Sequence, residues 1–334
     1  MSDNLLKSNR FLPLLLTQFF GALNDNLFKN ALLTMVAFKL TDKADILSNI
    51  IAGLFILPFF LFSATAGEVA DKYNRAKIAR VLKITELILM CAVAFVFYTE
   101  NITLLIILLA LMGTQSAFFG PIKYALLPQL LAKDELINAN AYVEASTYTA
   151  ILLGLILGTL LPVSAAIAVL IALALCGVIA SRRIPDAPAP RPNAEISKNI
   201  FKAMADTFHI IHKNPVVFKS ILGATWFWTV GALVAVQIYP LAGQILHASA
   251  GVITYFLIVF SLGVAFGSLA CGKILKGLIH ATYIPVSALG MGLSLYALYA
   301  LTKNYQTPAE LITLNTFFTT PSSDKISAAL FLLA

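Results

Sequence analysis

One aspartate lies in the middle of a long apolar run near the N-terminus. Asp25 is flanked by Asn24 and Asn26, and Lys29 follows one helical turn later on the same face. A charge at the centre of a bilayer costs about 2.5–3.5 kcal/mol on insertion scales, so a membrane-embedded Asp25 must face protein or water. An internal Asp25–Lys29 pair would satisfy that need without any further role.

The polar residues around Asp25 exceed what such a pair requires. Asn30 adds a further amide, and Gln18, Gly21 and Asp25 follow one another at three- and four-residue spacing, which places them on one helix face. We therefore favour a polar line that faces a central cavity, with Gln18, Asn24, Asn26 and Lys29 as binding residues beside Asp25.

Two glutamates lie inside other apolar runs. Glu86 and Glu144 each sit one to two turns from a run's end, near Lys83 and Lys123 respectively. Each fits a gate ion pair or a cavity residue equally well, and we assign Glu86 to a gate and Glu144 to the binding site.

Lys123 and Tyr124 follow Gly120-Pro121, where we expect a helix to stop. They can meet an anion at that end of the run, although a plain basic residue beside the membrane explains Lys123 as well. Gln237 is a plausible polar contact from the second half of the chain.

Other kinds of chemistry leave no pattern in the sequence. The four histidines lack metal-ligand spacing, and we find no Gly-rich phosphate loop and no nucleophile elbow. We therefore expect no metal, no cofactor and no enzymatic activity in this chain. The three cysteines lack CxxC spacing, and we expect them to be small core hydrophobes.

The composition requires elements that cross a membrane. Of 334 residues, 59% are hydrophobic and 12% are charged, with a mean hydropathy of +0.87. A soluble domain is far more polar, which argues against a nucleic-acid-binding protein, a cytosolic enzyme and a disulfide-stapled secreted domain. Runs of about 20 apolar residues predict nine complete spans. They are residues 11–38, 46–66, 79–98, 101–120, 138–160, 163–181, 217–240, 250–270 and 282–302.

Charge asymmetry predicts the orientation of these spans. With a cytoplasmic N-terminus, most of the 23 Lys and Arg residues, Lys83 among them, fall at the cytoplasmic side. The net charge of +7 is then a matter of topology and requires no nucleic acid.

The spans are grouped into two halves. We expect a six-helix bundle at 1–181, a cytoplasmic linker with a Pro-rich stretch and an amphipathic helix at 182–216, and an incomplete bundle at 217–334. The last nine residues are apolar but too short to cross a bilayer, so we expect a tenth span that is cut short.

The loop after the second span carries a recognisable signature. It retains the following positions of the pattern between spans two and three of the major facilitator superfamily: Gly67, Asp71, Lys72, Arg75 and Lys77. Asn74 replaces a glycine, and because Asn tolerates left-handed geometry we expect the turn to survive. The chain resembles that superfamily, which implies an all-α bundle in which these loop residues act in gating.

A narrower resemblance covers much of the first half. Residues 18–26, 120–127, 138–146 and 150–154 are similar to the bacterial lysophospholipid transporter family. That resemblance implies a multi-pass protein of the bacterial inner membrane that moves lysophospholipids from the outer to the inner leaflet. It also implies an acyltransferase partner, separate or fused to the transporter.

A lysophospholipid headgroup suits the residues of the first span. Asp25 can receive the ammonium of a phosphoethanolamine head, and Lys29 can receive its phosphate. Two other interpretations stay open. One is a proton-coupled exporter or symporter of another amphiphile, with Asp25, Glu86 and Glu144 as proton carriers. The other is the transport module of a fused acyltransferase enzyme.

Overall fold

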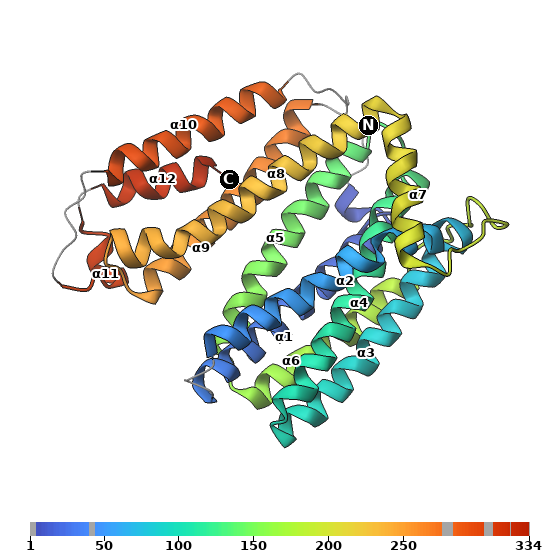
Figure 1. The fold of residues 1–334 in the computed structure, drawn as a ribbon, viewed down its shortest axis with the longest axis horizontal. Coiled ribbons are helices and arrows are strands. Elements are labelled where there is room, and N and C mark those ends of the chain that lie inside the picture. The colour runs from blue at the N-terminus through green and yellow to red at the C-terminus, as the bar shows by residue number, and fades with distance from the viewer. Residues whose placement is uncertain (1–4, 40–43, 276–282, 304–309, 321, 334) are drawn as a thin grey trace. The chain divides into compact units, whose positions relative to one another are not determined.

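The chain folds almost entirely into long helices (Figure 1). The computed structural model describes residues 5–39, 44–275, 283–303, 310–320 and 322–333. Within these ranges the only strand-like pairing is one isolated bridge between Ala248 and Ile312. The helices are α1 (Leu12–Lys39), α2 (Ala44–Lys72), α3 (Arg75–Thr99), α4 (Ile102–Leu130), α5 (Leu136–Leu160), α6 (Val163–Arg182), α7 (Ile200–Lys213), α8 (Pro215–Pro240), α9 (Ala250–Leu275), α10 (Ile284–Thr302), α11 (Leu314–Phe317) and α12 (Ser323–Leu333).

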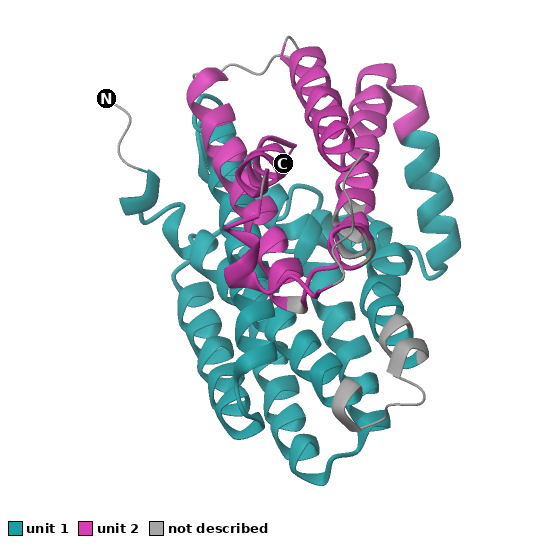
Figure 2. Ribbon diagram, turned by 90° about the vertical axis from the view of Figure 1, so that its left-hand side faces the viewer, with its two compact units in different colours: residues 1–210 teal, residues 211–334 magenta. Residues whose placement is uncertain are grey.

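Two compact units make up the chain (Figure 2). Unit 1 is Met1–Ile210 and unit 2 is Ile211–Ala334, so the division falls inside α7. This point lies within residues 182–216, the segment that the sequence predicts to be a linker. The borders 1–181 and 217–334 stay predictions.

Local sequence explains where the helices of unit 1 begin. The Asn74 side chain accepts a hydrogen bond from the Lys77 backbone N–H and caps α3, and Asn101 caps α4 through Leu104 in the same way. Glu100, between these helices, takes a left-handed conformation with φ of 53°. Caps of this kind satisfy backbone donors that a helix leaves open at its start.

Close packing of α1 on α5 fixes the position of the polar face of α1. A Cβ on Gly154 would lie 2.6 Å from the Asn26 Cβ, and a Cβ on Gly158 would lie 2.6 Å from the Leu27 carbonyl oxygen. Only glycine lets the two backbones approach so closely. The four-residue spacing of these glycines on α5 therefore sets the rotation of α1 at Asn26.

Seven helices in the described part of the chain are long and apolar enough to cross a membrane: α2 from Ile50, α3, α4, α5, α6, α9 from Gly251, and α10. Each of the nine predicted runs overlaps a long helix, but α1 and α8 are not among the seven. Polar residues at the centre of α1 lower its hydropathy. The count of nine spans and a shortened tenth stays a prediction.

Two local expectations are wrong, and a third holds for a different reason. Helix α4 does not stop at Gly120-Pro121 but continues through Pro121 and Pro128 to Leu130, since neighbouring helices can re-satisfy the backbone groups that a proline frees. The turn at Asn74 is present, but Asn74 is extended rather than left-handed, with φ of −61°, and serves as a helix cap. The three cysteines, Cys91, Cys176 and Cys271, are exposed on helix surfaces and are not in the core.

Unit 2 has an aromatic core of its own. Tyr255 and Phe256 of α9 pack against Phe317 of α11, with ring centroids 5.9 and 5.3 Å from the Phe317 ring. Helix α12 packs against α9 and α10, and the Tyr255 hydroxyl donates to Ser327 on α12 at 3.2 Å. These contacts hold the described helices of unit 2 together.

Candidate functional site

Asp25 is a nearly buried carboxylate with one oxygen in use. It is 9% exposed, and its Oδ2 accepts a hydrogen bond of 2.6 Å from the Ser116 hydroxyl on α4. Its Oδ1 is buried without a hydrogen-bond partner among the described residues, and the same holds for Oδ1 of Asn24. Burying an acceptor without a hydrogen bond destabilises the folded protein by about 1–3 kcal/mol. A ligand that donates a hydrogen bond to either oxygen would remove that penalty.

A complete ion pair lies beside these acceptors. Lys83 and Glu86 on α3 are 2.5 Å apart, and their side chains are 2% and 1% exposed. Asn24 donates to Oε1 of Glu86 at 3.1 Å, which links the pair to α1. We call the set Asn24, Asp25, Lys83, Glu86 and Ser116 the buried polar cluster.

Lys83 is not one of the basic residues at the cytoplasmic ends of the spans, contrary to the prediction from sequence. The sequence predicts Lys83 among the cytoplasmic basic residues, but the residue lies about two turns inside α3 and is 1% exposed. Its ammonium also lies 4.9 Å from the centroid of the Phe119 ring. Lys83 therefore belongs to the interior of unit 1 and says nothing about which side of a membrane is basic.

Two glycines make room for the Lys83 side chain. A Cβ on Gly21 would collide with the Lys83 ammonium, and a Cβ on Gly177 would lie 3.3 Å from Lys83 Cδ. Gly21 was expected to continue the polar line of α1. In the structure Gly21 has a steric role: its missing side chain leaves room on α1 for the Lys83 ammonium.

The polar line predicted on α1 packs against several helices. Gln18 donates to the Val143 carbonyl on α5 at 3.2 Å and to the Ser146 hydroxyl, and it accepts from Thr147 at 3.1 Å. Asp25 meets α4 instead. The predicted line is therefore shared between neighbours inside unit 1, and it does not form a single open face there.

Lys29 and Asp25 take different partners. Lys29 Nζ donates to the Asn26 side chain at 3.0 Å and lies 5.4 Å from the centroid of the Phe55 ring on α2. Asn26 in turn donates to the Ala22 carbonyl at 2.8 Å. The predicted site residues of α1 thus form two adjacent groups, one around Asp25 and one around Lys29.

A second group joins α4 to α5. The Tyr124 hydroxyl donates to Glu144 at 2.5 Å, and Lys123 Nζ lies 4.8 Å from the centroid of the Tyr124 ring. The three residues predicted from separate stretches therefore come together. Tyr124 is exposed and Glu144 is half-buried, so a polar ligand can reach this group more readily than the buried polar cluster.

The residues predicted to gate lie where α2 turns into α3. Arg75 donates to the Asp71 carboxylate at 3.1 Å, and also to the carbonyls of Ala70 and Ala125 at 2.9 and 3.0 Å.

The other residues predicted to gate make fewer contacts. Gly67 faces open space, so no close approach requires a glycine there. Lys72 Nζ lies 6.0 Å from the centroid of the Tyr73 ring, and the Lys77 backbone N–H donates to the capping side chain of Asn74. Glu86 lies apart from this turn, in the buried polar cluster.

The Pro-rich stretch is bound to this same turn, which the sequence did not suggest. The Ala187 carbonyl accepts from the Arg75 backbone at 3.0 Å, and the Arg191 backbone donates to the Asp71 carbonyl at 2.9 Å. The Asp186 carboxylate accepts from Asn74 at 2.8 Å. Two more hydrogen bonds hold the segment. The Glu68 carboxylate accepts from the Ser197 backbone N–H, and the Gln129 side chain donates to the Pro188 carbonyl. We call residues 184–197 the strap.

Gln237 lies near the end of α8 in unit 2, where its side chain is exposed. Its part in a binding site stays a prediction. Among the described residues, no group of three His, Cys, Asp or Glu side chains lies close enough to hold a metal ion.

Similarity to known proteins decides the family. The family model of the Major Facilitator Superfamily matches residues 14–323, which is most of the chain. The chain belongs to the Major Facilitator Superfamily. It is therefore a multi-pass membrane protein of a transporter family.

Relatives within the superfamily carry a more specific name. The chain is 28% identical over 284 residues to the lysophospholipid transporter LplT of Klebsiella pneumoniae (strain 342), and the match covers 80% of this chain and 67% of that protein. It is 27% identical over 242 residues to LplT of Serratia proteamaculans (strain 568), covering 69% and 57%. The chain thus spans about two thirds or less of these relatives.

Proposed function

We propose that this superfamily member moves lysophospholipids from the outer to the inner leaflet of the bacterial inner membrane by alternating access. The proposal is supported by its similarity to proteins named lysophospholipid transporters. The observation that carries it is the carboxylate of Asp25, which is buried in the middle of α1 with one oxygen unpartnered.

The headgroup chemistry fits the atoms around Asp25. An ammonium has three N–H donors and no acceptor, and Oδ1 of Asp25 and Oδ1 of Asn24 are two buried acceptors on adjacent residues. Lys29, one turn away, receives the phosphate of the same headgroup. A zwitterion bound in this way meets charges of both signs and is not left unpaired in hydrocarbon.

Alternating access accounts for the burial of the proposed site. With 9% of its surface exposed, Asp25 can meet a headgroup only after helices packed against α1 move. The Asp71–Arg75 pair and its neighbours Gly67, Lys72 and Lys77 then act at the cytoplasmic gate. Tyr124, Lys123 and Glu144 form a polar contact on the path between Asp25 and that gate.

The test is uptake of labelled lysophosphatidylethanolamine by spheroplasts that lack their own lysolipid uptake and express the complete gene product. We expect Asp25→Asn to lower uptake at least tenfold, because loss of a charged partner to a buried ammonium costs about 1.5–3 kcal/mol. Asp134→Asn removes one carboxylate from an exposed loop position and should leave uptake unchanged.

An uncoupler in a parallel sample separates the proposal from its rival. Uptake that survives the uncoupler and fails in Asp25→Asn supports a lysolipid transporter that needs no proton gradient. Wild-type expression without lysolipid uptake contradicts the proposal. Uptake abolished by the uncoupler favours proton coupling, in which Asp25, Glu86 and Glu144 are the candidate carriers.

A further inference from the structure

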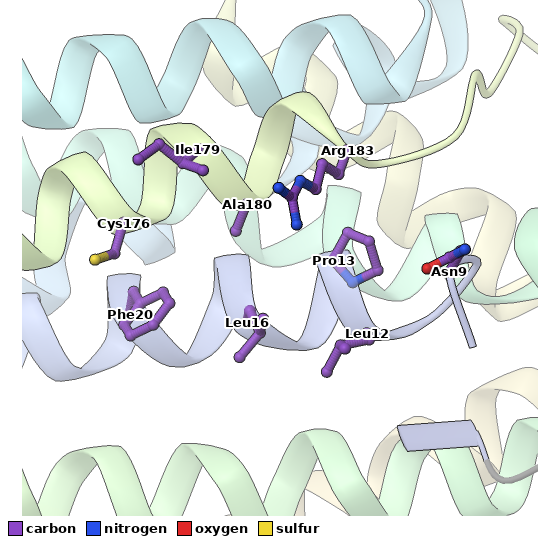
Figure 3. Close-up of a pocket in the computed structure, with 9 residues that line it drawn as sticks. All are labelled: Asn9, Leu12, Pro13, Leu16, Phe20, Cys176, Ile179, Ala180 and Arg183. Carbon is purple, nitrogen blue, oxygen red and sulfur yellow. The ribbon is translucent and has the colours of Figure 1, made fainter. Parts of the chain in front are cut away.

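A groove of about 220 Å³ runs between α1 and α6 on the surface of unit 1 (Figure 3). Apolar side chains form its walls, with Leu12, Leu16 and Phe20 on α1 facing Ile179 on α6. Ile179 is 56% exposed and Leu16 is 36% exposed. In a protein that spans a membrane, an open apolar groove of this kind is filled by hydrocarbon.

One end of the groove is polar. Asn9 precedes α1 and Arg183 follows α6, and Figure 3 shows both at the same end, with Cys176 and Phe20 toward the other. The backbone N–H of Arg183 closes the last turn of α6 on the Ala180 carbonyl at 3.0 Å. Its guanidinium is exposed, points toward α1, and has no acceptor within hydrogen-bond distance among the described residues.

The length of the groove matches one leaflet. From Leu12 to Phe20 an α-helix rises about 12 Å, and half of a hydrocarbon core of about 30 Å is about 15 Å. A groove of this length therefore suits one leaflet, with its polar end at the membrane boundary. A molecule with a headgroup at Arg183 and an acyl chain along Leu16 and Phe20 fills it without crossing the membrane.

We propose that this groove is a binding site for a resident anionic diacyl phospholipid, such as phosphatidylglycerol, with its phosphate at Arg183 and one acyl chain between α1 and α6. The guanidinium and the Asn9 amide supply donors to the phosphate oxygens. The exposed guanidinium of Arg183 carries a full positive charge at this end of the groove, so it favours an anionic headgroup over a zwitterionic one.

The site is distinct from the proposed lysolipid site. It lies on the outside of unit 1 and contains none of the residues of the buried polar cluster. A resident lipid here joins the start of α1 to the end of α6, so its role is to hold the two helices that carry Asp25 and border Lys83. The inference does not depend on the proposed substrate.

The experiment is lipid titration of the purified full chain in detergent, with bound lipid counted by native mass spectrometry. Phosphatidylglycerol and phosphatidylethanolamine with identical acyl chains are the probes. We expect one phosphatidylglycerol to bind in preference, and Arg183→Gln to weaken it about tenfold, since a charge-assisted hydrogen bond is lost. Arg182→Gln, which removes the same charge one residue away, should change affinity less than twofold.

A second variant tests the apolar wall. Leu16→Trp fills the groove at an exposed position and should lower phosphatidylglycerol binding while Arg183 is intact. Equal losses from Arg182→Gln and Arg183→Gln would reduce the effect to general surface charge and overturn the proposal. Equal binding of both lipids, or displacement of phosphatidylglycerol by lysophosphatidylethanolamine, would overturn it as well.

Discussion

Lys83 and Glu86 bury a full ion pair in a region that the sequence marks only as an apolar helix with two charges. Desolvating two ions costs about as much as their attraction returns, so such a pair contributes little to stability while both partners are present. Removal of one partner is different, because it leaves an uncompensated charge in the interior.

This asymmetry gives a prediction for the pair. Lys83→Met or Glu86→Gln alone should destabilise the protein by about 3–5 kcal/mol, whereas the double variant should be close to wild type. Thermal unfolding in detergent measures the three variants side by side. If the double variant is as unstable as either single one, charge balance is not what decides the stability of the cluster.

Sequence alone identified Asp25 but not its surroundings. A carboxylate within an apolar run is conspicuous because its cost in a membrane is high. Its partners, Ser116 on α4 and the Lys83–Glu86 pair on α3, lie 91 positions away for Ser116 and about 60 for Glu86, and no local period connects them. The three-residue spacing of Lys83 and Glu86 was the one local signal. It suggested an ion pair, but one at a gate, with Lys83 counted among the cytoplasmic basic residues.

At the scale of the helices, glycines decide how α1 and α5 meet. Gly154 and Gly158 lie against α1 with no space for a methyl group, whereas Gly53 on α2 has nothing within 4 Å of its missing Cβ. All three are inside helices, so alanine should gain about 1 kcal/mol of helix propensity at each. Only at α5 does a steric clash oppose that gain.

The sign of the alanine effect should therefore differ between these glycines. Gly53→Ala should raise the unfolding temperature slightly, while Gly154→Ala and Gly158→Ala should lower it and shift α1. Thermal unfolding with lysolipid uptake as a second readout checks both parts. Stabilisation by all three substitutions would mean that α1 and α5 are not packed as closely as described.

Helix ends were harder to predict than helix positions. Prolines mark ends well in soluble proteins, yet α4 passes through Pro121 and Pro128 because packing overrides local preference. That continuation is also what carries Lys123 and Tyr124 on a helix facing Glu144. The continuation of α4 past Pro121 thus explains both why its end was predicted wrongly and why Lys123 and Tyr124 lie beside Glu144.

At the scale of the whole molecule, orientation is the clearest untested expectation. With a cytoplasmic N-terminus, the α4–α5 connection at Lys133 should be inside and the α5–α6 connection at Leu160 outside. Both positions are exposed, and the native cysteines can be replaced by serine. An impermeant maleimide should label Leu160→Cys in intact spheroplasts, and Lys133→Cys only after permeabilisation. The reverse pattern would invert the topology.

Family membership was accessible from sequence because it depends on a contiguous loop pattern, Gly67 to Lys77, and on repeated apolar runs. The division into compact units was less accessible. A Pro-rich stretch predicts an extended spacer, but it does not disclose that backbone groups at Ala187 and Arg191 bond to the α2–α3 turn.

The strap shortens the free chain between α6 and α7, inside unit 1. From its number of residues, an extended linker over 182–216 would span tens of ångströms. Residues 184–197 are pinned, however, and Asn199 caps the next helix through Phe201 and Lys202. About two residues of free chain remain before α7, a reach of about 7 Å. Any shift of the first turn of α7 is therefore passed to the end of α2, where Glu68 and Asp71 bond the strap.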